Sequence, residues 1–137
     1  MVYLDASAVM KLVVQEPESS ALREFVEAEG GRASSELLFA EIPRALRRPW
    51  WSHGSADSVR LLARGEAELG AMYLIALSRS VLTLAGTLEG PLLRALDAIH
   101  VATAISYPGE LRAFVSYDDR QLEAAERAVL AVASPGR

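Results

Sequence analysis

Four acidic residues in otherwise apolar segments are the side chains of this chain best suited to do chemistry. They are Asp5, Glu41, Asp97 and Asp118. Asp5 follows Val2-Tyr3-Leu4, and Asp97 interrupts an apolar stretch that continues through Ala98-Ile99. Carboxylates are seldom buried in such surroundings unless they are paired or bound to a metal ion. Oxygen ligands suit Mg²⁺ and Mn²⁺, so the sequence predicts a site for one or two of these cations.

Hydrolysis of a phosphodiester is a reaction that needs such a site. A metal-bound water of lowered pKa attacks in line, and a second cation stabilises the leaving oxygen. Several carboxylates are needed to hold two dications, and their mutual repulsion should raise some of their pKa values when no metal is bound. We expect Asp5 and Asp97 to make the primary metal contacts. Glu41 and Asp118 then complete the coordination or act through ordered water.

Each acid also has a purely structural explanation. Asp5 or Asp118 taken singly is typical of a helix cap, and Glu41 is placed to pair with Arg44 three residues later. Asp119 is adjacent to Asp118 and is an alternative ligand, although an acid in the first turn of a helix often only faces solvent. The presence of all four acids together favours a metal site over separate structural roles for each acid.

A further group of residues is expected to hold the ligands or to position the substrate. Ser7 is a candidate for phosphate contact, although capping a helix explains it as well. Ser116 is of a type that orients a carboxylate or a water, and His100 lies on the same helix face as Asp97, where packing or support of a ligand is favoured over metal binding. Contact with a phosphate backbone, or a solvated face, explains the basic stretch Arg44, Arg47 and Arg48.

Composition favours one globular domain over residues 1–137. The chain is 51% hydrophobic and 23% charged, and a chain of this length can bury roughly two-thirds of its unfolded surface. The absence of cysteine excludes disulfides and thiolate zinc sites and fits a cytoplasmic protein. No apolar run approaches the roughly twenty residues of a membrane span. The net charge of −4 argues mildly against nucleic-acid binding, unless cations held by the acids offset it.

Apolar periodicity predicts strands that alternate with helices. Strands are expected at residues 2–4, 32–34, 72–77, 111–117 and 130–132. Helices are expected at 8–14 with Ser7 as cap, from Pro17 to Gly30, from about Ser35 to Arg48, from Asp57 to Leu69, and at 81–88, 93–105 and from Asp118 onward. The fold class is therefore α/β, with a central, mostly parallel sheet of about four or five strands flanked by about seven helices. Ligands of such sheets lie beyond the carboxyl ends of the strands, where Asp5 and Asp118 fall.

Four segments, taken together, resemble the PIN domain and are similar to the VapC toxins of bacterial toxin–antitoxin pairs. They are Tyr3 to Leu12 (YLDASAVMKL), Glu41 followed by Arg44, Leu96 to Ala104 (LDAIHVATA) and Val115 to Arg120 (VSYDDR). Their order, spacing and total length agree with the family over essentially the whole chain. The resemblance implies a metal-dependent ribonuclease whose acids at positions 5, 41, 97 and 118 hold one or two divalent cations. It also implies an RNA substrate, a small VapB-like antitoxin that blocks the site, and a homodimer.

Three other classes of protein are alternatives to a metal-dependent ribonuclease. A response-regulator receiver needs paired acids after its first strand and a late lysine, but Asp5 is single and Lys11 is the only lysine. A haloacid-type phosphatase needs a second aspartate two residues after the first, where Ser7 stands. A catalytically idle module that only binds a partner stays open, and an RNA cleavage assay with and without metal separates it from an enzyme.

Overall fold

A parallel sheet forms the centre of the computed structural model, which describes residues 1–47, 55–89 and 93–137. Its five strands are β1 (Val2–Leu4), β2 (Arg32–Ser35), β3 (Tyr73–Ile75), β4 (Phe114–Val115) and β5 (Val132–Ala133). They lie in the order β3-β2-β1-β4-β5, and every pairing is parallel. The α/β prediction is confirmed, and the sheet is wholly rather than mostly parallel.

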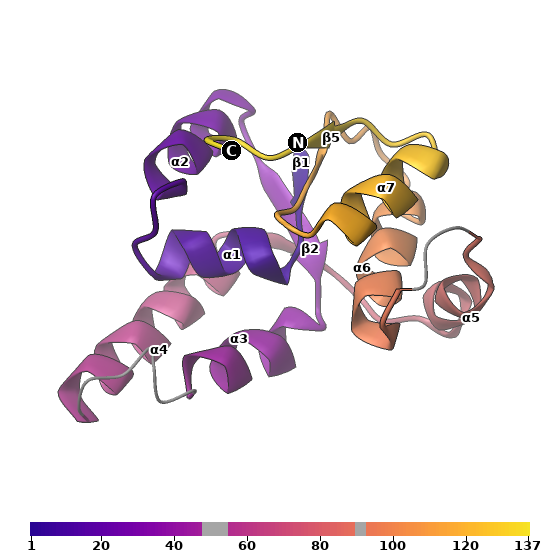
Figure 1. Ribbon diagram of the computed structural model, residues 1–137. Helices are drawn as coiled ribbons and strands as arrows, with labels where there is room; N and C mark the ends of the chain where they lie inside the picture. The colour runs from indigo at the N-terminus through magenta and orange to yellow at the C-terminus, as the bar shows by residue number, and fades with distance from the viewer. Residues whose placement is uncertain (48–54, 90–92) are drawn as a thin grey trace.

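Seven helices accompany these strands in the parts of the chain that the structure describes. They are α1 (Ala6–Val13), α2 (Ser19–Ala28), α3 (Leu38–Leu46), α4 (Ser55–Gly70), α5 (Arg79–Thr87), α6 (Ala95–Ile105) and α7 (Asp119–Arg127). Figure 1 shows α1, α2 and α4 on one side of the strands and α5, α6 and α7 on the other. None of the described helices is long and apolar enough to span a membrane.

The two faces of the sheet carry separate hydrophobic cores. Val2 and Leu4 pack with side chains of α1 to α4, whereas Tyr3, between them, packs with Phe114 and with side chains of α6 and α7. Successive residues of a strand point to opposite faces, so a strand buried on both sides has to be apolar throughout. The three residues of β1 are fully buried, and they anchor the residue that follows, Asp5, in the interior.

Several predicted boundaries were wrong in an informative way. Ser7 does not cap α1, because Asp5 is the cap and accepts from the backbone N–H of Ala8. The second helix starts at Ser19 rather than Pro17, and Asp57 lies inside the first turn of α4. The run at residues 72–77 forms only the short edge strand β3, where Tyr73 is 58% exposed. The predicted end of the third helix at Arg48 falls outside the described residues.

The parallel sheet brings two of the predicted acids to one edge. Asp5 directly follows β1, and Asp118 follows the neighbouring strand β4 by three residues. Because paired parallel strands end on the same side, both acids lie at the carboxyl edge. Glu41 in α3 and Asp97 in the first turn of α6 approach this edge from the helical layers.

Candidate active site

Asp5 is the buried centre of the site. Its side chain is 0% exposed and accepts hydrogen bonds from Ala8 N at 2.8 Å, from Ser7 Oγ at 2.7 Å and from Ser116 Oγ at 2.7 Å. Burial raises the pKa of Asp5, while the nearby His100 and these donated hydrogen bonds oppose the rise. Asp5 is therefore both the helix cap of the structural explanation and a carboxylate held in the interior.

The two serines connect Asp5 to the loop that carries Asp118. Ser7 Oγ accepts from the backbone N–H of Tyr117 at 2.9 Å, and Ser116 Oγ accepts from that of Asp118 at 3.0 Å. Each hydroxyl thus donates to Asp5 and accepts from the loop after β4. The predicted supporting roles of both serines agree with this geometry, and Ser7 acts across two elements rather than as a cap.

Glu41 is hydrogen-bonded to His100, and it forms no ion pair with Arg44 among the described residues. The distance from His100 Nε2 to Glu41 Oε2 is 2.7 Å, and the side chain of Glu41 is 17% exposed. The other ring nitrogen, His100 Nδ1, lies 2.9 Å from the hydroxyl of Tyr3. His100 is only 1% exposed, so this histidine is packed in the interior and hydrogen-bonded to an acid of the site. Tyr3 was not predicted as a site residue.

The charges of the other three acids of the site act on the pKa of Asp97. This pKa is raised by partial burial, then by the charges of Asp118, Asp5 and Glu41, while the charge of His100 acts in the opposite direction. A carboxyl group responds in this way only to charges that lie near it. Residues from four separate parts of the sequence therefore concentrate negative charge around Asp97.

Gln121 is a site residue that the sequence reasoning missed. Its Nε2 donates to Asp97 Oδ1 at 3.2 Å, and the side chain is 4% exposed. Its backbone N–H donates to Asp118 Oδ1, as does that of Arg120, so Asp118 caps α7. The sequence signal for Gln121 was its position three residues after Asp118. A residue at this spacing lies in the first turn of the helix that Asp118 caps.

The neighbouring Asp119 faces solvent at the rim of this cluster. Its side chain is 78% exposed and pairs with Arg137 at 2.8 Å. The solvent-facing explanation therefore describes Asp119 better than a ligand role does.

A pocket of about 490 Å³ opens onto Asp97. It is lined by Arg94, Asp97, Tyr117, Asp118, Asp119 and Arg120. Arg94 and Arg120 are exposed, and neither guanidinium forms an ion pair among the described residues. The sequence reasoning missed both arginines, although Arg94 precedes Asp97 by three residues and Arg120 lies in the last acidic segment.

The arginines of the predicted basic stretch do not lie together on one pocket. Arg44 is exposed and lines a second pocket of about 360 Å³ beside Glu41, Met10 and Leu96. Arg47 is also exposed but lines a different pocket, between α3 and α4. Arg48 lies outside the described residues.

Each of the four carboxylates is hydrogen-bonded to a protein group. Across residues 1–47, 55–89 and 93–137, no group of three or more acidic or histidine side chains is placed so that it could hold a metal ion. Chemically the set fits a hard divalent cation, because all four side chains offer carboxylate oxygens and their repulsion raises the pKa of Asp97. A cation would neutralise this excess of negative charge.

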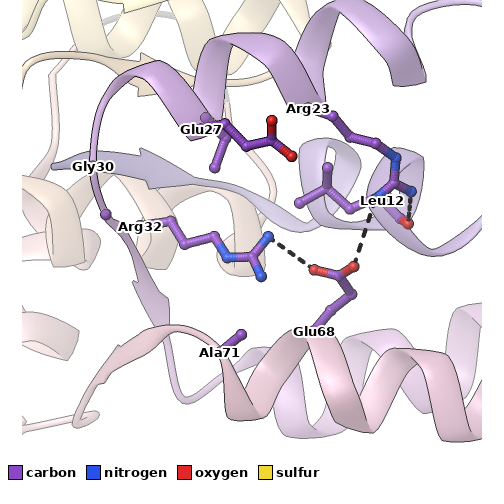
Figure 2. Close-up of a pocket in the computed structure, with 9 residues that line it drawn as sticks. Leu12, Arg23, Glu27, Gly30, Arg32, Glu68 and Ala71 are labelled. Atoms are coloured by element: carbon purple, nitrogen blue, oxygen red, sulfur yellow. Dashed lines mark hydrogen bonds and ion pairs between the residues drawn. The ribbon is translucent and has the colours of Figure 1, made fainter.

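Another pocket, shown in Figure 2, lies at the opposite edge of the sheet. It adjoins Gly30 and Gly31, which precede β2, and it contains none of the four acids. Its charges pair with one another, since Glu68 lies 2.8 Å from Arg32 and 3.8 Å from Arg23. This balance of charge gives the pocket no resemblance to a cation site.

Comparison with known proteins shows the family of the chain. The model of the PIN domain family matches residues 2–127. The chain is 41% identical over 134 residues to Ribonuclease VapC46 of Mycobacterium tuberculosis (strain ATCC 25618 / H37Rv), covering 98% of this chain and 97% of that protein. It is 36% identical over 140 residues to Ribonuclease VapC47 of M. tuberculosis (strain CDC 1551 / Oshkosh), covering 99% and 98%.

A solved structure shares the fold at low sequence identity. It is the crystal structure of VapBC2 from Rickettsia felis bound to a DNA fragment from their promoter, with a TM-score of 0.72 and 15% identity over 98% of this chain and 99% of the other. The fold, the family model and the full-length identity to two ribonucleases lead to one conclusion. The chain belongs to the PIN-domain family, among the VapC ribonucleases.

Proposed function

We propose that this protein is the toxin of a type II toxin–antitoxin pair and an endoribonuclease that hydrolyses phosphodiester bonds of RNA. The observation that carries the proposal is the concentration of carboxylates around Asp97, whose pKa is raised by burial and then by Asp118, Asp5 and Glu41. Such a cluster in an open pocket is suited to dications and, through them, to a phosphodiester. The full-length identity to VapC ribonucleases supports the same reaction.

PIN-family ribonucleases generally use a divalent metal, and we propose Mg²⁺ or Mn²⁺ here, as one or two ions. Asp5 and Asp97 would hold it, with Glu41 and Asp118 completing the set. The cation supplies a water of lowered pKa and neutralises charge on the phosphate. Ser7 and Ser116 keep Asp5 oriented through their hydrogen bonds of 2.7 Å. Gln121 donates to Asp97 Oδ1, so an ion would bind the other carboxylate oxygen, Oδ2, without displacing this contact.

The RNA backbone would lie across the rim of the acidic pocket. Arg94 and Arg120 line that pocket, and Arg44 lines the one beside Glu41. Guanidinium groups bind phosphate oxygens with two parallel hydrogen bonds, so these arginines can offset the net charge of −4 locally. Arg47 lies on another pocket and is a weaker candidate.

The proposed partner is a VapB-like antitoxin. A pocket rich in carboxylates attracts an arginine or lysine side chain, so we propose that the antitoxin inserts one near Asp5, Glu41 and Asp97. An apolar tail would lie over α1 and α2, and the apolar side chains of Met10, Ile42 and Leu96 in the pocket beside Glu41 give it a place to continue.

A homodimer is also proposed, with its seam on a part of the fold that follows α2. The large apolar side chains that are exposed among the described residues lie outside α1 and α2. They are Phe39, Val59, Tyr73, Leu77, Leu82, Leu96 and Val129. The early helices bury their apolar residues, as Leu22 and Val26 do, so a dimer would use a later part of the fold.

The test is cleavage of mixed RNA by purified protein in Mg²⁺, in Mn²⁺ and in chelator. We expect cleavage only with metal, and its loss in Asp97→Asn. Asp57→Asn is the matched control, because Asp57 lies in α4 and pairs with Arg60 on the surface. Undiminished cleavage by folded Asp97→Asn would contradict the assignment, and a metal-dependent fold without any cleavage would favour the idle binding module.

A further inference from the structure

We propose that Tyr3 and His100 are positioning residues that hold the carboxylate of Glu41 through a continuous hydrogen-bonded chain. The inference rests on the proposed function, because Glu41 is proposed there as a metal ligand. It adds a tyrosine of β1 to a site that the sequence analysis built from acidic residues. The chain connects three elements: Tyr3 in β1, His100 in α6 and Glu41 in α3.

The donors and acceptors along the chain follow from the chemistry of its ends. An ionised glutamate accepts hydrogen bonds only, so His100 Nε2, at 2.7 Å from Glu41 Oε2, is the donor. In the neutral ring the second nitrogen is then an acceptor, and the hydroxyl of Tyr3, at 2.9 Å from Nδ1, donates to it, whereas in the doubly protonated ring both nitrogens donate and the tyrosine oxygen accepts. A single tautomer, with the proton on Nε2, satisfies both contacts.

Burial keeps the inner end of this chain in place. Tyr3 is 0% and His100 1% exposed. The ring of Tyr3 stacks on Phe114 at a centroid distance of 5.3 Å and an interplanar angle of 8°, and it meets the ring of His100 edge to face at 6.0 Å. The aromatic packing therefore fixes the hydroxyl, the hydroxyl fixes the imidazole, and the imidazole fixes the carboxylate.

Glu41 needs such support more than Asp5 and Asp118 do. Asp5 accepts from two serines and a backbone N–H, and Asp118 accepts from two backbone N–H groups. Glu41 has the longer side chain, and His100 is the partner that the structure gives its carboxylate. Partners that orient a ligand in this way commonly change metal affinity by about 10- to 100-fold when they are removed.

The first readout is the tautomer of His100, measured by ¹⁵N NMR of the imidazole in metal-free protein. The sequence contains two histidines, so a His100→Gln variant identifies the signal. We expect the Nε2-protonated tautomer in both the unsubstituted chain and Tyr3→Phe, because Glu41 accepts from Nε2. In Tyr3→Phe, which keeps the stacking on Phe114 and removes only the hydroxyl, the ¹⁵N shift of Nδ1 should change because this nitrogen loses its hydrogen bond. Tyr73→Phe is the matched control, because Tyr73 is 58% exposed on the edge strand.

The second readout is Mn²⁺ binding by electron paramagnetic resonance without RNA. Tyr3→Phe should raise the Kd about tenfold, whereas Tyr73→Phe should leave it unchanged. If Tyr3→Phe does not fold, His100→Leu and His100→Gln replace it, and the glutamine, which can still donate to Glu41, should recover part of the affinity lost in His100→Leu.

Two results would overturn the inference, and they are distinguishable from failure of the proposed function. An unchanged Nδ1 shift and an unchanged Kd in folded Tyr3→Phe, with Mn²⁺ bound normally by the unsubstituted chain, would refute the positioning chain alone. An unsubstituted chain that binds no Mn²⁺ would refute both the proposed metal site and the role of Tyr3.

Discussion

Gln121 Nε2 donates to Asp97 Oδ1 at 3.2 Å, while Gln121 Oε1 is buried without a hydrogen-bond partner among the described residues. The amide thus orients an acid of the site whose pKa is raised and leaves its own carbonyl oxygen unsatisfied. A buried acceptor without a partner costs free energy of folding. The arrangement is easier to explain by a role for Gln121 at Asp97 than by packing alone.

Replacement of Gln121 by methionine should separate these two contributions. The unpaired carbonyl and the hydrogen bond to Asp97 disappear together, so the free energy of unfolding should change by no more than about 1 kcal/mol. Orientation of Asp97 should suffer, and RNA cleavage should fall by about tenfold. Urea denaturation and cleavage kinetics measure the two effects, with Gln15→Met on the exposed surface as control. Equal loss of stability and activity would point to a packing role only.

The raised pKa of Asp97 predicts a pH dependence of stability in metal-free protein. Burial, followed by the nearby charges of Asp118, Asp5 and Glu41, raises this pKa above its ordinary value of 3.8. Between the two values the folded state binds more protons than the unfolded state, so the contribution of Asp97 to stability falls as pH rises through that window.

The Asp97→Asn variant removes this contribution and should gain stability relative to the unsubstituted chain as pH rises. Urea denaturation in EDTA, from about pH 4 to about pH 8, gives the difference between the two proteins. A difference that stays constant over this range would show that Asp97 titrates alike in both states.

Divalent metal should stabilise the folded chain. Because the four carboxylates repel one another without a cation, saturating Mg²⁺ or Mn²⁺ should add about 1–3 kcal/mol to the free energy of unfolding. The double variant Glu41→Gln, Asp97→Asn should melt no lower than the unsubstituted chain in EDTA and gain little on metal addition. Thermal unfolding with and without metal measures both, and a melting temperature that ignores metal in the unsubstituted chain would count against the site.

The two arginines of the acidic pocket should act on RNA binding rather than on the reaction. Arg94→Ala and Arg120→Ala should each raise KM several-fold, reduce its dependence on salt and leave kcat nearly unchanged, because each removes one phosphate contact. Arg60→Ala is the control, since Arg60 is exposed in α4 and pairs with Asp57. KM values equal to that of the control would place the RNA elsewhere on the surface.

Inhibition by the proposed antitoxin should depend on one basic side chain. Reversing the charge of the antitoxin residue nearest to Asp5, Glu41 and Asp97 should restore ribonuclease activity in the purified complex, because like charges would then meet in the pocket. Co-expression with the unaltered antitoxin should relieve toxicity. Full inhibition by the charge-reversed antitoxin, in a complex that still forms, would mean that it blocks the site sterically.

The sequence by itself was sufficient for the α/β class, the family resemblance and the choice of the four acids. Apolar segments such as Val2-Tyr3-Leu4 can only be buried strands, and an acid that follows such a strand has to lie at its carboxyl end. His100 could be assigned to the face of Asp97 from helical spacing. These inferences depend on local periodicity, which the order of residues carries directly.

Only the tertiary structure decided which side chains meet. That Ser7 donates to Asp5 and accepts from Tyr117, that Glu41 pairs with His100 rather than Arg44, and that Tyr3 completes this chain all depend on contacts between distant segments. The same holds for Gln121 at Asp97 and for the outward turn of Asp119. Periodicity specifies the face of an element on which a residue lies, but hydrogen-bond partners are set by how the elements pack, because a displacement of one or two ångströms makes or breaks such a contact.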